Sequence, residues 1–103
     1  MMSSRVSFSL AVVLASMSLS VWAAPSASEQ TCRACHDINN KKVGPAFREI
    51  AASYRNDPDA LAKIKKSILQ GSQGKWGSIP MPANAIADDE ADRFAHWVMS
   101  LNK

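Results

Sequence analysis

The chain has 103 residues, a formal net charge of +3 and 47% hydrophobic residues, which is the size of one small domain. A domain this small buries a low fraction of its surface, so its own side chains make a thin core. The positive excess is slight, and no basic cluster is interleaved with aromatic residues, which argues against a nucleic-acid-binding protein.

Residues 1–23 have the pattern of a secretion signal. Arg5 supplies a positive start, a run of uncharged apolar and small residues follows, and Val21-Trp22-Ala23 suits signal peptidase. We expect cleavage after Ala23, export to the periplasm, and a mature domain over 24–103. The alternative is an uncleaved transmembrane anchor, which the short apolar run and its serines disfavour. No stable membrane anchor is therefore expected.

A short first helix is expected to run into the segment Cys32-Arg33-Ala34-Cys35-His36. Two cysteines separated by two residues and followed directly by histidine form the attachment pattern of c-type haem. The spacing suits the chemistry, because two thiols add to two vinyl groups of one haem while the next residue can coordinate the iron. Cys32 and Cys35 are the only cysteines in the sequence, so none is left for a disulfide. We expect one covalently bound haem c, with His36 as an iron ligand.

A loop and two helices are expected after this motif. Residues 39–45 are rich in Asn, Lys and Gly and predict the loop, whereas the spacing of apolar residues predicts a short helix over 46–54. The Asp-Pro-Asp run at 57–59 suits the start of the next helix, with its first aspartate as the N-cap, and Gly71 suits its end. The buried stripe expected on that helix consists of Leu61, Ile64 and Ile68.

Residues 71–87 contain three glycines and two prolines, which predicts an irregular loop without a strand. A loop of this length in a compact domain suggests a functional role. The last helix is expected to begin near Asp88, with acidic residues in its first turn. The residues expected on its inward face are Phe94, Ala95, Val98 and Leu101. The predicted fold class is all-α, with three to four short helices and long loops.

The sixth ligand of the iron decides between electron transfer and small-molecule chemistry. In the mature domain the candidates are Met81, Met99 and His96. Met99 and His96 fall on the last helix, where packing or exposure to solvent explains them without a ligand role. Met81 stands between two prolines, which fix the chain locally, so Met81 is the predicted ligand. Thioether ligation raises the reduction potential and closes the iron to oxygen and peroxide.

Three runs of the mature chain, taken in order, carry a resemblance to a known family. They are Cys32-Arg33-Ala34-Cys35-His36, then Val43-Gly44-Pro45-Ala46-Phe47, and then the stretch from Gly71 through Trp76 to Ile79-Pro80-Met81-Pro82. Together they resemble the small bacterial class I monohaem cytochromes c, especially the short subtype that donates electrons to nitrite reductase or terminal oxidases. The resemblance implies a cytochrome c fold around one haem, attached through Cys32 and Cys35 and ligated by His36 and Met81.

The resemblance also implies contacts and a function. The Pro45 carbonyl would hold the second ring nitrogen of His36, and the Trp76 indole N–H would point at a haem propionate. The implied function is a soluble periplasmic electron carrier, monomeric and without enzyme activity. Its redox partners, such as a nitrite reductase, a terminal oxidase or a membrane cytochrome complex, would dock transiently at the exposed haem edge.

The docking surface expected at that edge has an apolar centre and nearby cations. The apolar residues are Ala34, Val43, Ile79, Pro80, Pro82 and Ala83. The cations that could steer an acidic partner are Arg33, Lys41, Lys42 and Lys75.

The sequence leaves three other functions open. A haem enzyme or gas sensor would leave the iron open opposite His36, although no Arg–His pair accompanies Met81. A haem-free module would bind zinc or act as a dithiol, which requires a fourth ligand or a βαβ context. A subunit of a larger oxidoreductase would carry the same haem site as a free carrier.

Two features depart from the family. Only residues 24–31 precede Cys32, without the glycine and aromatic residue by which a longer first helix crosses the last one. Ala87 stands where relatives often have a serine cap, so the last helix must use Asp88 as its cap or have none.

Overall fold

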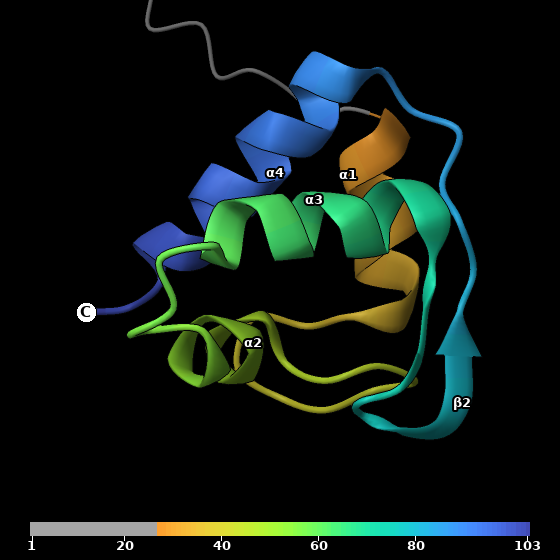
Figure 1. Ribbon diagram of the computed structural model, residues 1–103. Coiled ribbons are helices and arrows are strands. Elements are labelled where there is room, and N and C mark those ends of the chain that lie inside the picture. Colours follow the sequence, from red (N-terminus) through yellow and green to blue (C-terminus); the bar gives the residue numbers. More distant parts are fainter. Residues whose placement is uncertain (1–26) are drawn as a thin grey trace, which may run out of the picture.

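The computed structural model describes residues 27–103, and these form four helices and one two-stranded antiparallel sheet. The elements are α1 (Ala27–Cys35), α2 (Phe47–Ser53), α3 (Ala60–Gln70), β1 (Ser72–Gly74), β2 (Gly77–Met81) and α4 (Asp88–Ser100). In Figure 1, α2 lies below α3 and α4, and the hairpin of β1 and β2 forms the side of the molecule away from the carboxyl terminus. The predicted secretion signal lies outside the described residues.

No helix within 27–103 has both the length and the apolar character needed to cross a membrane.

The core forms where α2, α3 and α4 meet. On α4, Ala91 and Ala95 are 0% exposed, and these small side chains let α3 approach closely. The remaining buried apolar residues of the three helices are Phe47, Ala51, Ala60, Ile64, Ile68 and Val98. No large side chain among the described residues is completely buried, so the core is thin, as the chain length predicts.

The helix predicted after residue 57 is present as α3, but its start and its buried stripe differ from the prediction. The Asp57 carboxylate accepts hydrogen bonds from the Asp59 backbone N–H at 2.8 Å and from Lys63 Nζ at 2.6 Å, so it organises the turn before α3 instead of capping the helix. The stripe consists of Ala60, Ile64 and Ile68, which recur every four residues. Leu61 lies about 100° around the helix from Ala60 and is 37% exposed, so its predicted burial is wrong.

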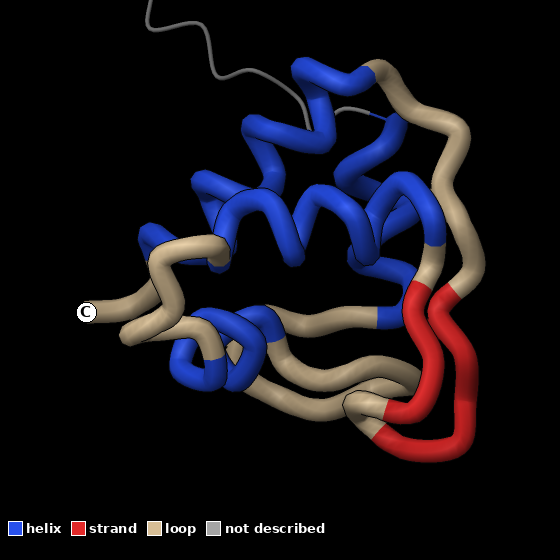
Figure 2. Tube along the Cα trace, in the orientation of Figure 1, coloured by secondary structure: helices blue, strands red, loops and turns tan. Residues whose placement is uncertain are grey.

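The prediction that residues 71–87 hold no strand is wrong. Ser72 pairs with Met81 and Gly74 with Gly77 across an antiparallel hairpin, which is coloured red in Figure 2. Gly74 and Gly77 have φ angles of 81° and 119°, so they provide the backbone conformations that the tight turn requires. The glycines that argued against a strand are therefore what allows these two short strands to pair.

Helix α4 begins without a side-chain cap, because Ala87 occupies the N-cap position. The carboxylates in its first turn are favoured by the positive end of the helix dipole. Lys65 of α3 adds ion pairs to Asp88 and, at 3.3 Å, to Asp92. These contacts join α3 to the start of α4.

The first helix contacts the last through residues other than those usual in the family. Ser28 donates a hydrogen bond to the Glu90 carboxylate. The Arg33 guanidinium lies 5.8 Å from the centroid of the Trp97 ring. A hydroxyl–carboxylate contact and a cation–π contact thus join α1 to α4.

Candidate functional site

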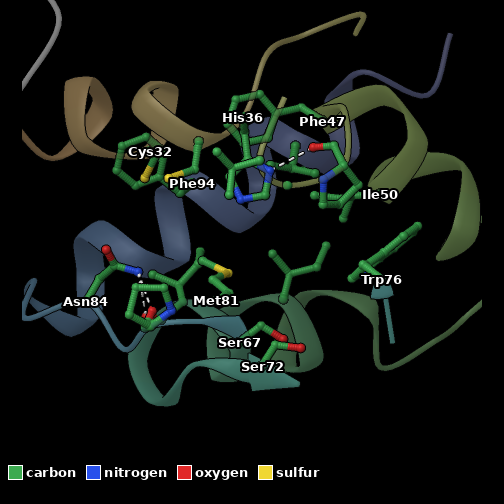
Figure 3. A pocket seen from close by; sticks show the side chains of 18 of the residues that line it. Cys32, His36, Phe47, Ile50, Ser67, Ser72, Trp76, Met81, Asn84 and Phe94 are labelled. Atoms are coloured by element: carbon green, nitrogen blue, oxygen red, sulfur yellow. Dashed lines mark hydrogen bonds between the residues drawn. The ribbon is translucent and has the colours of Figure 1, made fainter. Parts of the chain in front are cut away.

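A cavity of about 220 Å³ lies between the residues that follow α1 and the β1–β2 hairpin. Most of its lining is apolar, and the walls also include parts of α2, α3 and α4. In Figure 3, His36 and Met81 lie on opposite walls, with Cys32 towards one end and Trp76 at the other. The site residues predicted from the sequence all line this cavity: Cys32, Cys35, His36, Pro45, Trp76 and Met81.

His36 follows the last residue of α1 and is 7% exposed. Its Nδ1 atom lies 2.7 Å from the carbonyl oxygen of Pro45, in a buried contact of the kind the resemblance implies. Because a carbonyl can only accept a hydrogen bond, Nδ1 must carry the proton and donate it. The lone pair is then on Nε2, which is the form of neutral histidine that binds a metal.

Two neighbours hold the imidazole plane, and sequence reasoning missed both contacts. The Phe47 ring stacks on His36 with centroids 5.1 Å apart and planes inclined by 27°. Gly44 lies so close that a Cβ atom there would be 2.5 Å from His36 Cε1. Gly44 therefore provides space for the ring, a requirement that appears only once the chain has folded.

Cys32 and Cys35 lie three residues apart on α1 and both thiols are free. This spacing places them on one face of the helix, and both line the cavity. Burial raises the pKa of the Cys32 thiol, and this effect outweighs the lowering by a backbone hydrogen bond. Two thiols and one imidazole on neighbouring turns fit the requirements of covalent haem attachment.

Met81 ends β2, and Figure 3 shows its thioether directed into the cavity from the wall opposite His36. Its backbone is held by close packing, since a Cβ at Gly71 would lie 2.6 Å from the Met81 carbonyl oxygen. Beyond it, the Asn84 side chain donates to the carbonyl oxygens of Ile68 at 3.1 Å and Pro82 at 3.3 Å. The hairpin and these contacts together place the sulfur.

The other two ligand candidates lie elsewhere. Met99 is half-buried against the core and His96 is exposed on α4, and neither lines the cavity. Within residues 27–103, no three His, Cys, Asp or Glu side chains come close enough together to hold a metal ion. The zinc hypothesis therefore gains no support from the structure.

Among the polar side chains of the cavity that sequence reasoning missed, three lie near Met81. Ser67 comes from α3, Ser72 from β1 and Asn84 from the segment after the hairpin. Figure 3 shows all three on the Met81 side of the cavity. A signal for Ser67 was present, because it follows the buried Ile64 by three residues and so shares its face of the helix.

Comparison with known proteins supports the same interpretation. The family model for cytochrome c matches residues 24–102. Cytochrome c-551 of Pseudomonas aeruginosa is 51% identical over 69 residues, which are 67% of this chain and 66% of that protein. Cytochrome c-552 of Hydrogenobacter thermophilus is 41% identical over 75 residues, covering 73% of this chain and 76% of that protein.

A solved structure of a related protein has the same fold. Wild-type cytochrome c552 of Nitrosomonas europaea superimposes with a TM-score of 0.70 at 42% identity, covering 74% of this chain and 95% of that one. The predicted cytochrome c fold is thereby confirmed, with the hairpin as an addition to its helices. The chain therefore belongs to the cytochrome c family, as a small class I monohaem cytochrome c whose cofactor is one c-type haem.

Proposed function

We propose that the chain is a periplasmic one-electron carrier whose haem is attached through Cys32 and Cys35 and ligated by His36 and Met81. The observation that carries the proposal is the placement of the imidazole and the thioether on opposite walls of one apolar cavity. The bound haem supplies the redox-active iron. The chain supplies two ligands from different elements, each held by its own contacts.

The two proposed ligands, His36 and Met81, would affect the iron differently. His36 is fixed in ring plane and tautomer by Pro45, and a donor hydrogen-bonded in this way is more basic. The Met81 thioether is soft and favours reduced iron, which raises the reduction potential. Because both donors are held before electron transfer, their geometry changes little between oxidation states. Trp76, at the other end of the cavity from Cys32, would donate its indole N–H to a propionate.

The proposed periplasmic location rests on the sequence of residues 1–23, which lie outside the described residues. We propose that residues 1–23 direct export and are removed after Ala23. The mature domain would then begin at residue 24 and acquire its haem in the compartment where c-type attachment takes place.

The spectrum of the haem-loaded protein tests the proposed ligation. We expect a low-spin ferric form with the weak iron–thioether band, and a ferrous form that carbon monoxide leaves unchanged. Met81→Ala should lose the band and bind carbon monoxide, whereas Met99→Ala, a matched methionine outside the cavity, should behave as the wild type. A high-spin wild type, or one that binds carbon monoxide readily, would favour the open-site enzyme or sensor.

We expect redox partners to dock over an exposed apolar surface beside the cavity. Val43 is 52% exposed and Ile79 is 64% exposed, and both also line the cavity. The other members of the predicted surface are exposed as well: Ala34, Pro80, Pro82 and Ala83. An exposed apolar centre of this kind suits a transient contact with a nitrite reductase, a terminal oxidase or a membrane cytochrome complex.

The cations near this surface differ in how freely they can steer a partner. Arg33 is paired with Glu29 at 3.0 Å, and Lys75 lies over the Tyr54 ring. Lys41 and Lys42 are exposed without an acidic partner in the described part of the chain, although Lys42 Nζ donates a hydrogen bond of 2.9 Å to the Arg33 carbonyl oxygen. Replacing Lys41 and Lys42 by glutamine should slow the reaction with an acidic partner at low salt, with little change at high salt. A wild-type rate that does not depend on ionic strength would contradict steering.

A further inference from the structure

Lys75 occupies the turn of the hairpin, and its ammonium group lies on the face of an aromatic ring from another element. Lys75 Nζ is 3.7 Å from the centroid of the Tyr54 ring and 5.7 Å from that of Trp76. Tyr54 directly follows α2, is 7% exposed and lines the cavity. The contact therefore joins the tip of the hairpin to the end of α2.

The hairpin has few other attachments at its tip. Its base is fixed to the end of α3, where Gly71 packs on the Met81 carbonyl and Asn84 bonds to Ile68. Trp76 at the tip is half-buried and lines the cavity, whereas its neighbours beyond the base are exposed: Gln73, Gly74, Gly77, Ser78, Ile79 and Pro80. A hairpin fixed at its base can swing away at its tip unless a contact holds the tip.

Lys75 also lies near the turn between α2 and α3, where its charge acts on Asp57. The pKa of Asp57 is lowered, first by the hydrogen bond from Lys63, and Lys75 contributes a smaller electrostatic part. Lys75 thus lies close enough to this turn for its charge to be felt there. Both observations place the ammonium group on the helical side of the cavity.

We propose that Lys75 is a positioning residue that fastens the hairpin over the cavity through the face of Tyr54 and thereby keeps Met81 in place. A cation over a largely buried ring is held more strongly than one over an exposed ring, because the ring's surroundings exclude water. Met81 ends β2, the strand that leaves the turn of Lys75, so a swing of the tip about the fixed base tilts β2 and redirects the Met81 side chain. This inference rests on the proposed ligation by Met81.

The test is the displacement of the thioether by imidazole in the ferric, haem-loaded protein. Lys75→Met keeps the length of the side chain and removes its charge, so it should raise the imidazole association constant by roughly three- to tenfold, the range expected for loss of a cation–π contact. Lys75→Arg should restore the wild-type value, since a guanidinium group also binds the ring face. Lys66→Met, which removes an exposed charge from α3, is the matched control and should have no effect.

A double-mutant cycle with Tyr54→Leu identifies the partner. In that background Lys75→Met should cause no further change, because the ring face is already gone. Amide hydrogen exchange over residues 72–81 should be faster in Lys75→Met than in the wild type, and this readout does not depend on the iron ligand. Wild-type exchange and imidazole binding in Lys75→Met, or an equal effect of Lys66→Met, would overturn the proposal. If the wild type lacked the thioether band, the proposed ligation by Met81 would be wrong. Hydrogen exchange would then test by itself whether Lys75 fastens the hairpin.

Discussion

The imidazole of His36 is held on three sides by groups of the chain itself. The Pro45 carbonyl accepts a hydrogen bond from one ring edge, and the Phe47 ring covers one face. The Gly44 backbone lies so close to the ring that a side chain at this position would clash with it. Such packing sets the direction of the Nε2 lone pair before iron is bound. The position of Gly44 should therefore be as sensitive to substitution as the ligand itself.

Gly44→Ala should disturb the ligand and destabilise the protein. The new Cβ would lie 2.5 Å from His36 Cε1 and 2.9 Å from Nδ1, so the ring must move and its bond to Pro45 must lengthen. Overpacking of this kind costs about 1–3 kcal/mol in the free energy of unfolding. Urea unfolding of the haem-loaded protein would measure that loss, and its ferric spectrum would show a weaker ligand field.

Gly74→Ala is the control for this prediction. It adds the same methyl group where no atom lies within 4 Å, but at a φ of 81°. The left-handed backbone should cost about 1–2 kcal/mol without any clash on the imidazole, so this variant measures backbone strain apart from displacement of the His36 ring. If Gly44→Ala kept both the wild-type spectrum and the wild-type stability, the close packing on His36 would not constrain the ligand.

At this scale the sequence predicted candidate donor atoms more readily than the residues that hold them in place. Cys32, Cys35, His36 and Met81 could be selected because their chemistry and spacing are specific, and folding brings all four to one cavity. The role of Gly44 could not be selected in this way. A glycine has many uses, and the need for one at this position becomes clear only from the folded position of the His36 ring.

Among the elements, the helices were predictable and the hairpin was not. Helical periodicity is a repeated signal over two or three turns, so α3 and α4 were recognised with small errors at their ends. The hairpin is short, rich in glycine and proline, and stabilised by pairing across a turn, so no local period reveals it. Leu61 was misplaced because Ala60, a small residue, occupies the buried position.

The residues after α4 form hydrogen bonds with α2. The Asn102 side chain donates a hydrogen bond of 2.7 Å to the carbonyl oxygen of Ala51, near the end of α2. The Arg48 guanidinium of α2 in turn donates to the Leu101 carbonyl oxygen at 3.1 Å. These two contacts join α2 to the residues that follow α4.

Asn102→Ala should lower the free energy of unfolding by about 1 kcal/mol, because a partly buried carbonyl loses its partner. Asn102→Asp should cost at least as much, since a carboxylate has no proton to donate to a carbonyl. Asn40→Ala removes an exposed contact of 3.4 Å and is the matched control, with no change expected. Equal stability of Asn102→Ala and the wild type in urea unfolding would show that the chain end contributes nothing to α2.

The whole molecule is arranged around its cavity more than around a core of its own. Helices α2, α3 and α4 bury chiefly small and medium side chains, and residues of α1 and of the hairpin also line the cavity. The fold class could be predicted because one motif specified a covalently bound group large enough to replace a core. The orientation of the hairpin could not be predicted, because it depends on contacts across the cavity, such as the contact of Lys75 with Tyr54.

This arrangement predicts that the chain folds only with its haem. Without haem, the largely apolar walls of this cavity would be exposed to water, and the thin core of the helices offers little to offset that loss. The Cys32→Ala/Cys35→Ala variant, produced without haem, should therefore show weak helical circular dichroism and no cooperative thermal transition, whereas the haem-loaded wild type shows both. A haem-free variant that unfolded cooperatively from a helical state would mean that the helices support one another without the cofactor.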